Sequence, residues 1–439
     1  MSSVKSLQLQ SNSKIKINFN GGDLSSDSGL LLIKEFANKF GFDKHISQFE
    51  TDENDILRRH KDHQNLAQLV YQILAGYFND NDADELTNEP VFKSILCKDA
   101  LASQPTLSRF WNRMGTDTIK QFEDIIRQMR SSAYKIQMPK QVLLDLDSTL
   151  LNTYGKQEGQ GFNYHYQAHG YHPLLCYDGL TGDLLKADLR DGTAYSSTGV
   201  VHFMQPLLDE YLTKYPKIQL FLRGDSGFAT PDLYKQCESN GVSYAIRLKA
   251  NRALYAHAKH LDDEIAEATK DNMIDYVVRY DEFEYKAGKW DYPRRVIVKV
   301  EKPCNQLTNQ YSFIVTNMDL SPEELIKYYR NRGTMENFIK ESKSGFDFAS
   351  TPSKDKIVNA NHLLLHVLAY NLFNCFKRLV LPESMRKMLI DTIRLKLFKI
   401  ASKIVKAARY IHFKLCSSCP YKDEFYEILE NIRRLPQLE

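Results

Sequence analysis

The order of strand-like and helix-like segments between residues 141 and 250 restricts the fold of this chain more than any other feature. Apolar runs of strand length and two segments of helical pattern follow one another as strand, strand, strand, helix, strand, helix, strand. The strands are expected at 141–151, 171–178, 183–190, 218–228 and 243–250, and the helices at 199–214 and after Thr230-Pro231. This succession predicts an α/β fold built on one mixed sheet.

Two of the predicted strands carry aspartates. Asp145 and Asp147 lie on the first strand and share a face, because side chains alternate along a strand. The fourth strand ends at Arg223-Gly224-Asp225. The strand order is that of an RNase H-like core, a mixed five-stranded sheet with helices, in which the first and fourth strands are neighbours. Asp225 is therefore expected beside the aspartates of the first strand.

Carboxylates buried close together need a nearby positive charge, because burying an unpaired charge costs on the order of several kcal/mol. A divalent cation supplies that compensation, and oxygen ligands suit Mg²⁺. A site for two ions needs a third carboxylate. These residues therefore predict a metal site that is completed from elsewhere in the chain.

A helix that begins near Ser321 can supply the third carboxylate. The run Ser321-Pro322-Glu323-Glu324 is a capping-box pattern with proline at the first helical position. The pattern predicts one helix that continues to about Gly345. The core helix with its motif is assigned to 319–350.

One face of this predicted helix carries a stripe of charged and aromatic residues. At 100° per residue the stripe occupies an arc of roughly 60°, slightly widened by one lysine. Its members are Tyr329, Arg332, Glu336, Lys340 and Lys343. Gly333 lies on the same face, where it permits a close approach. The spacing alone is compatible with two interpretations, a solvated face with ion pairs or a face that holds a metal against a phosphate backbone.

The spacing Tyr329-x2-Arg332-x3-Glu336-x6-Lys343 resembles the YREK signature of DDE transposases from bacterial insertion sequences, in the cut-and-paste branch. The run starting at Asp147 (Asp-Ser-Thr) is similar to the D-x-T block of that family.

Three further segments extend the resemblance over most of the chain. RGDSGF (223–228) is similar to the second-aspartate block, and GGDLSSDSGLLLIKEF (21–36) and ASQPTLSRF (102–110) resemble insertion-sequence family thirteen-eighty.

The resemblance implies a metal-dependent DNA transposase. Asp147, Asp225 and Glu336 would be catalytic and would hold two Mg²⁺ ions, with Mn²⁺ able to substitute. Asp145 is left as the alternative first carboxylate or as a supporting residue. The implied reaction is cleavage of double-stranded DNA at the terminal inverted repeats by two-metal phosphoryl transfer, followed by joining of the 3′-hydroxyl ends to target DNA. Relatives act as dimers, so a homodimer is expected.

DNA contacts are expected at several basic positions. Tyr329, Arg332, Lys340, Lys343 and Arg223 surround the predicted site. Arg109 and Arg113 lie in a segment (104–113) that fits a recognition helix in a major groove, or any exposed helix. Residues 386–414 hold nine Lys and Arg against one acid, which fits a phosphate-contacting helix or strand pair, or a polar face over a dimer interface.

An insert at 251–318 separates the second aspartate from the helix, and its sequence alternates like antiparallel strands. In the resembled branch such an insert carries an aromatic side chain that stacks on a base flipped out of the DNA. Trp290, Tyr311 and Phe313 are the candidates, although most aromatics in strands belong to the core.

The remaining regions complete the organisation. A mainly helical DNA-binding region is expected at 1–138, the first part of the core at 139–250, and a helical region for DNA binding or dimerisation at 351–439. The first residues have no signal-peptide pattern and the most apolar stretch, 362–373, is too short to span a bilayer, so a cytoplasmic, nucleoid-associated protein is expected. The net charge is only +3, so DNA affinity must come from local basic surfaces.

Two other functions share these sequence features. A related RNase H-like nuclease would use the same three carboxylates without strand transfer. A domesticated DNA-binding protein would keep the fold and lack activity, which the three intact acidic residues argue against.

Overall fold

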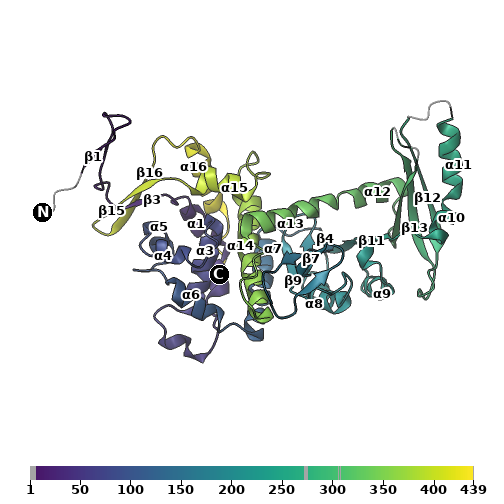
Figure 1. Ribbon diagram of the computed structural model, residues 1–439, viewed down its shortest axis with the longest axis horizontal. Coiled ribbons are helices and arrows are strands. Elements are labelled where there is room, and N and C mark those ends of the chain that lie inside the picture. The colour runs from purple at the N-terminus through teal and green to yellow at the C-terminus, as the bar shows by residue number, and fades with distance from the viewer. Residues whose placement is uncertain (1–5, 271–274, 305, 307, 439) are drawn as a thin grey trace. The chain divides into compact units, whose positions relative to one another are not determined.

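The computed structural model describes residues 6–270, 275–304, 306 and 308–438 (Figure 1). The chain divides into two compact units. Unit 1 comprises Met1–Ile136, Glu341–Phe348 and Leu364–Glu439, and unit 2 comprises Gln137–Lys340 and Ala349–Leu363. Each unit is described by itself below.

Unit 2 is built on an eight-stranded mixed sheet with the order β12-β13-β14-β11-β10-β4-β8-β9. Its first five strands in the chain are β4 (Gln141–Ser148), β8 (Leu174–Asp178), β9 (Leu184–Asp188), β10 (Gln219–Gly224) and β11 (Ser243–Leu248). β8 is antiparallel to its neighbours β4 and β9, whereas β4, β10 and β11 are parallel. The first and fourth of these strands are therefore adjacent, as predicted, and the order fits an RNase H-like core.

Helices α8 (Val200–Lys214) and α9 (Pro231–Ser239) connect these strands at the predicted places. The strands are apolar because they are buried. Val142, Leu144 and Leu146 of β4 have no exposed surface, and Leu222 of β10 has none either. Burial of both faces explains why the strands read as continuous apolar runs in the sequence.

The insert continues the same sheet rather than forming a separate one (Figure 1). It consists of α10 (Arg252–His257), α11 (Lys259–Ala268), β12 (Val277–Tyr285), β13 (Arg294–Lys302) and β14 (Gln310–Thr316). β14 pairs antiparallel with β11, with Ala245 opposite Thr316. Ala245, Ile297 and Ile314 form a buried cluster that the next helix covers with Leu325. One hydrophobic core therefore runs from the aspartate-bearing strands into the insert.

A second, small sheet lies in the connection between β4 and β8, where no strands were expected before residue 171. It has the order β5-β7-β6 and consists of β5 (Leu151–Asn152), β6 (Gly161–Asn163) and β7 (Ala168–Tyr171). The predicted first strand, 141–151, is therefore two strands, because the chain leaves the large sheet after Ser148.

The predicted helix at 319–350 is two helices, α12 (Pro322–Arg330) and α13 (Gly333–Phe346). The capping box is confirmed, since the Glu324 carboxylate accepts a hydrogen bond from the Ser321 backbone N–H at 3.1 Å. The expectation of one continuous helix is wrong, because α12 ends at the turn Asn331-Arg332. Gly333 opens α13, and apart from its chain neighbours and the backbone of its own helix, no atom of the described residues lies within 4 Å of the position that a Cβ would take there.

Unit 1 is mainly helical. Its N-terminal part contains β1 (Leu7–Gln8), β2 (Lys16–Ile17), β3 (Leu24–Ser25), α1 (Leu30–Phe40), α2 (Phe42–Ile46), α3 (Asp62–Ala75), α4 (Asp82–Glu85), α5 (Pro90–Ile95), α6 (Gln104–Trp111) and α7 (Thr116–Ile136). Its C-terminal part contains most of α14 (Lys356–Val380), then α15 (Ile390–Ile393), β15 (Ser402–Ala407), β16 (Tyr410–Leu415) and α16 (Lys422–Arg434). The C-terminal region, expected to be helical, thus also holds a β-hairpin.

The core of unit 1 joins segments that are far apart in the sequence. Phe36 of α1 packs edge-on against Phe376 of α14, with ring centroids 5.6 Å apart. Arg394 is buried and donates to the carbonyls of Ile73 and Leu74 in the last turn of α3 at 2.8 and 2.9 Å. The Ile73 carbonyl also accepts a hydrogen bond from the Gly76 N–H at 3.0 Å, so the arginine adds to the backbone cap at the end of this helix. Among the described residues, no helix combines the length and apolar character needed to cross a bilayer.

Candidate active site

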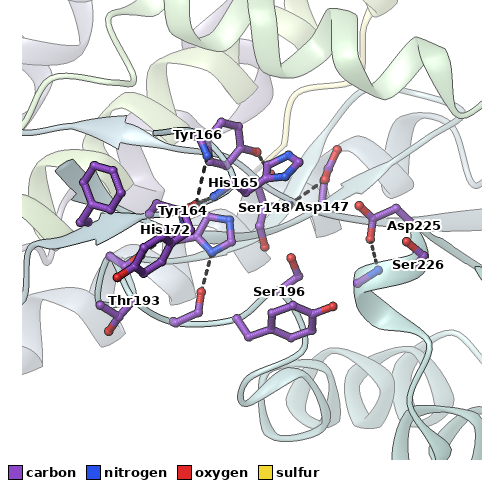
Figure 2. A pocket seen from close by; sticks show the side chains of 16 residues that line it. Asp147, Ser148, Tyr164, His165, Tyr166, His172, Thr193, Ser196, Asp225 and Ser226 are labelled. Carbon is purple, nitrogen blue, oxygen red and sulfur yellow. Dashed lines mark hydrogen bonds between the residues drawn. The ribbon is translucent and has the colours of Figure 1, made fainter. Parts of the chain in front are cut away.

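Asp147 and Asp225 line one cavity of about 490 Å³ in unit 2 (Figure 2). Their neighbourhood follows from the strand register, because Asp145 of β4 is paired with Arg223 of β10. Asp147 lies two residues beyond Asp145, and Asp225 lies two residues beyond Arg223, at the same ends of two parallel strands. The carboxylates therefore emerge together, as predicted from the strand order.

Backbone donors fix both carboxylates. The Asp225 Oδ1 atom accepts a hydrogen bond from the Gly227 N–H at 2.7 Å, which starts a short 3₁₀ turn. The Asp147 Oδ1 atom accepts from the Ser148 N–H at 2.9 Å. Each carboxylate is thus oriented from within its own segment, which favours a defined geometry at the cavity wall.

Arg332 contacts Asp147 directly. Its Nη2 atom lies 3.0 Å from the Asp147 Oδ2 atom, and the two side chains are 14% and 16% exposed. The same nitrogen donates to the Leu146 carbonyl at 3.4 Å. Arg332 was expected to grip a phosphate, but here its guanidinium neutralises a carboxylate of the site.

Burial raises the pKa of Asp147 to about 6. Arg332 opposes this shift, whereas the negative charges of Asp225 and Glu336 add to it. Glu336 is exposed in the first turn of α13 and is not among the residues that line the cavity. The third expected carboxylate is therefore within electrostatic range of the first, although it stands outside the cavity.

The donor types suit a hard divalent cation, because they are carboxylate oxygens whose charges repel one another. Their arrangement does not yet hold one: no group of three or more His, Cys, Asp or Glu in the described ranges is gathered closely enough to hold a metal ion. Joint binding by Asp147, Asp225 and Glu336 requires Glu336 to approach and Arg332 to move from Asp147. The residues present fit the chemistry of the ion, with this rearrangement as the condition.

Asp145 has a different environment from Asp147. It is fully buried, and Arg223 donates to both of its oxygens, at 2.7 and 2.5 Å. Burial raises the pKa of Asp145 and Arg223 opposes that shift. Gly179 permits this packing, because a Cβ there would lie 2.2 Å from the Asp145 Oδ2 atom. Both oxygens of Asp145 therefore take part in a buried ion pair with Arg223.

Arg223 is correspondingly not at the surface. Its side chain is 1% exposed, and it also donates to the carbonyls of Tyr328 and Asn331 at 2.9 and 3.4 Å. The Tyr328 carbonyl lies in the last turn of α12, and the Asn331 carbonyl lies in the turn after it, where it also accepts from the Thr334 N–H at 3.2 Å. The expectation that Arg223 contacts DNA is wrong, because its donors are used inside the protein.

The other members of the predicted stripe are distributed differently. Tyr329 is partly buried and donates to the Gly224 carbonyl at 3.1 Å, beside Asp225, and burial raises the pKa of its phenol to about 12. Lys340 is exposed on α13, and Lys343 is partly buried in the last turn of that helix. The break before α13 explains why the five residues do not form one continuous face.

Two of the three aromatic candidates in the insert belong to its core. Trp290 and Phe313 are 6% and 1% exposed, so neither can stack on a base, and these two expectations are wrong. Trp290 packs against the Arg294 guanidinium. Tyr311 is partly exposed, but its hydroxyl donates to Asp262 at 2.5 Å and its ring is stacked on Phe313.

A group of aromatic residues beside the carboxylates was not predicted from the sequence. Tyr164 and Tyr195 line the cavity and are 81% and 64% exposed. Tyr166, in the same turn as Tyr164, donates to the Ser148 carbonyl at 3.2 Å. The signal was the run Phe-Asn-Tyr-His-Tyr (162–166), which is unusually aromatic for a connection.

Two histidines also belong to this wall. Both His165 and His172 line the cavity, and His172 contacts the Ala194 carbonyl at 2.7 Å. Burial lowers the pKa of His172, which favours the neutral ring. Figure 2 shows His172 and Tyr164 across the cavity from Asp147 and Asp225.

The two arginines near α6 differ in accessibility. Arg109 is exposed, whereas Arg113 follows the helix and binds the buried carboxylate of Asp62 at 2.7 Å. Arg113 also donates to the Thr51 hydroxyl at 2.8 Å. A recognition role is therefore compatible with Arg109, while Arg113 holds the interior of unit 1 together.

A mixed sheet with aspartates at the ends of two neighbouring parallel strands, and a glutamate on a later helix, defines the class of DDE enzymes. The family model described as Transposase DDE domain group 1 matches residues 7–437, so the chain belongs to this family. The chain is a DDE transposase by family, and this family typically uses divalent metals.

One solved structure similar to this chain is the piggyBac transposase synaptic complex with hairpin DNA, determined by cryo-electron microscopy. The two chains are 14% identical with a TM-score of 0.43, over 94% of this chain and 86% of that one. No curated protein matches the sequence.

Proposed function

We propose that the protein is the transposase of a bacterial insertion sequence, of the YREK branch and of insertion-sequence family thirteen-eighty. It would bind the terminal inverted repeats, cleave them, and join the 3′-hydroxyl ends to target DNA as a homodimer. The single observation that supports this function best is the placement of Asp147 and Asp225 in one cavity, with Glu336 in electrostatic range.

Asp147, Asp225 and Glu336 are the proposed catalytic residues and the proposed ligands of two Mg²⁺ ions. Asp147 is preferred over Asp145 as the first carboxylate, because Asp145 forms a buried ion pair with Arg223. Ions held there would supply Lewis-acid chemistry at the phosphodiester. The protein itself contributes orientation, since the Gly227 N–H fixes Asp225.

Arg332 has a proposed positioning role. Its contact with Asp147 lowers the pKa of that buried carboxyl and so favours the ionised form near neutral pH. Asp147 and neighbouring charges likewise raise the pKa of Arg332, against the effect of burial. The pair favours the ionised carboxylate in a place where burial favours the protonated form.

DNA is the proposed partner of the cavity and of three cations, of which Lys340 and Arg109 are exposed and Lys343 is partly buried. The rings of Tyr164 and Tyr195 offer exposed faces on which a nucleobase can stack, a role that Trp290 and Phe313 cannot take. Lys340, Lys343 and Arg109 are proposed phosphate contacts.

The proposed chemistry is tested by cleavage of a duplex that carries the inverted repeats flanking the gene, with Mg²⁺ present. Asp147→Asn and Glu336→Gln should each lower the cleavage rate by about 10²–10³-fold, the scale seen when one electrostatic stabiliser of a transition state is removed. Glu323→Gln is the matched control, because Glu323 is an exposed acid on α12 whose surface pair with Lys327 contributes little. Equal cleavage by Glu336→Gln and wild type would refute the assignment.

Strand transfer separates the transposase from the alternative, an RNase H-like nuclease that only hydrolyses. Pre-cut ends with free 3′-hydroxyls are incubated with a supercoiled plasmid and Mg²⁺. We expect ends covalently joined to plasmid. Efficient cleavage of intact ends, without any joined product, would identify the nuclease instead.

A further inference from the structure

The hairpin β15–β16 in unit 1 is a two-stranded ribbon over most of its length. The strands pair from Ser402 opposite Leu415 to Ala407 opposite Tyr410, and a two-residue loop joins them. β3 pairs only with Ser402 and Lys403 at the base. An isolated ribbon is marginally stable in water, so the distal part gains little from folding alone.

The ribbon carries positive charge without any compensation. Residues 392–422 contain no Asp or Glu. The cations of the hairpin are Lys403, Lys406, Arg409 and Lys414, and all four are exposed. In the part of the chain that the structure describes, none of the four has an ion-pair partner. This distinguishes them from Arg394 and Lys399, which precede the hairpin and bind Asp391 and Asp27 at 2.7 and 2.5 Å.

The register adds a specific electrostatic conflict. Lys403 lies directly opposite Lys414, and like charges in that position destabilise a strand pair. The alternation of side chains places His412 and Tyr410 on the same face as this lysine pair. Nothing within the hairpin offsets the repulsion, so a polyanion bound along this face would relieve it.

The tip of the ribbon is apolar and exposed. Tyr410 and Ile411 are 71% and 51% exposed, and Arg409 stands in the loop beside them. The same hairpin of a second copy is a poor occupant of this surface, because it would bring lysines against lysines. The surface therefore combines cations along its length with apolar groups at its end, and it fits a partner that offers both phosphates and base or sugar edges.

We propose that the hairpin β15–β16 is a DNA-binding ribbon that lies in a groove of double-stranded DNA. This inference rests on the proposed function and assigns the hairpin as one of its DNA-contacting surfaces. Six residues per strand span about 20 Å at 3.3 Å per residue, and a two-stranded ribbon fits the B-DNA major groove, which is about 12 Å wide. The lysines and Arg409 contact phosphates, and Tyr410, on the same face as Lys403 and Lys414, contacts the groove floor.

The test measures the affinity of the full-length protein for an end duplex between 50 and 200 mM KCl. Four phosphate contacts contribute about 3.6 to the slope of log affinity against log salt, at roughly 0.9 per contact. Replacing Lys403, Lys406, Arg409 and Lys414 by Gln should remove that contribution. Over this fourfold change in salt, wild type should then lose about 150-fold more affinity than the Gln variant.

Two controls accompany the variant. Replacement of the three lysines by Arg keeps the charge and should keep the wild-type slope. Lys214→Gln combined with Lys217→Gln removes two exposed cations of unit 2 and should leave the slope within about one contact of wild type. Arg409→Gln alone, in the loop, should lower the slope by about 0.9 and serves if the fourfold variant fails to fold.

The outcomes separate this inference from the proposed function. If the Gln variant and Arg409→Gln both keep the wild-type slope while Asp147→Asn abolishes cleavage, the ribbon does not contact DNA and the active-site assignment stands. If wild type neither binds nor cleaves end DNA, both ideas fall. Binding to vesicles of anionic phosphatidylserine without binding to duplex would overturn the ribbon assignment in favour of a membrane surface.

Discussion

The buried pair of Arg223 and Asp145 gives a sharp test of how the core of unit 2 supports the candidate site. The two side chains are 1% and 0% exposed, and the guanidinium makes two contacts to the carboxylate. The same arginine caps α12 through the Tyr328 and Asn331 carbonyls. Arg223→Met keeps the length of the side chain and removes every one of these donors.

The expected penalty follows from the burial. Removing one partner of a buried ion pair costs about 3–5 kcal/mol, because the other charge is left uncompensated. For a unit of this size, the melting temperature changes by about 2–4 °C for each kcal/mol, so Arg223→Met should melt about 6–20 °C below wild type. Asp145→Leu alone should cost a similar amount, because it leaves Arg223 buried without its carboxylate.

The double variant decides whether the pair is the cause. Arg223→Met combined with Asp145→Leu leaves no buried charge and should recover at least about 2 kcal/mol of the summed single penalties. Thermal and urea unfolding followed by circular dichroism measure all four proteins. Strict additivity of the two single penalties would refute the argument, since it would mean that the two side chains do not interact.

Two further predictions concern pH. Arg332→Met should lower the free energy of unfolding by about 3–5 kcal/mol at pH 8, where Asp147 is ionised. At pH 5 the loss should be smaller by at least about 1.4 kcal/mol, because the Asp147 carboxyl, with a pKa of about 6, takes up a proton. Urea unfolding at the two pH values measures both losses, and equal losses would contradict this prediction. His366 is buried against the Phe346 carbonyl, and burial lowers its pKa from 6.5 to about 4. The unfolded chain then binds the proton more readily, so stability is present above pH 6.5 and is lost as the pH falls towards 4. Over that pH range the free energy of unfolding of the wild type should fall by up to about 3 kcal/mol more than that of His366→Asn. Parallel curves of unfolding free energy against pH for the two proteins would refute this prediction.

The strand order and the capping box could be predicted because each depends on local pattern. Buried strands must be apolar on both faces, and this makes them visible as runs between turn residues. Asp147 and Asp225 could be identified because an acidic residue at the end of a buried apolar strand is costly unless its charge is compensated. That the two aspartates are neighbours in space then followed from the strand order of the expected fold. The register of β4 and β10 places both aspartates at the same end of the sheet.

The roles of the arginines could not be predicted, because periodicity gives the face of a residue and not its partner. Arg223 and Arg332 looked like phosphate ligands, since each adjoins a predicted carboxylate. Both lie instead within 3.0 Å of aspartates on β4, and a buried guanidinium satisfies such a carboxylate as well as it would satisfy a phosphate. The break between α12 and α13 was missed for a related reason. Carbonyls freed at the end of α12 are stabilised by Arg223, a residue about a hundred positions earlier.

Asp145 and Asp147 show how two identical residues on one face of a strand acquire different chemistry. Asp145 lies deeper, where Arg223 contacts both of its oxygens, and it is not among the residues that line the cavity. Asp147, one step nearer to the strand end, has one contact from Arg332 and one from a backbone N–H, and it lines the cavity. A carboxylate held by one movable side chain can exchange that partner for a cation, whereas one held by a buried, helix-capping arginine cannot do so without disrupting α12. The position of the arginine, more than the position of the acid, therefore determines which aspartate is available for chemistry.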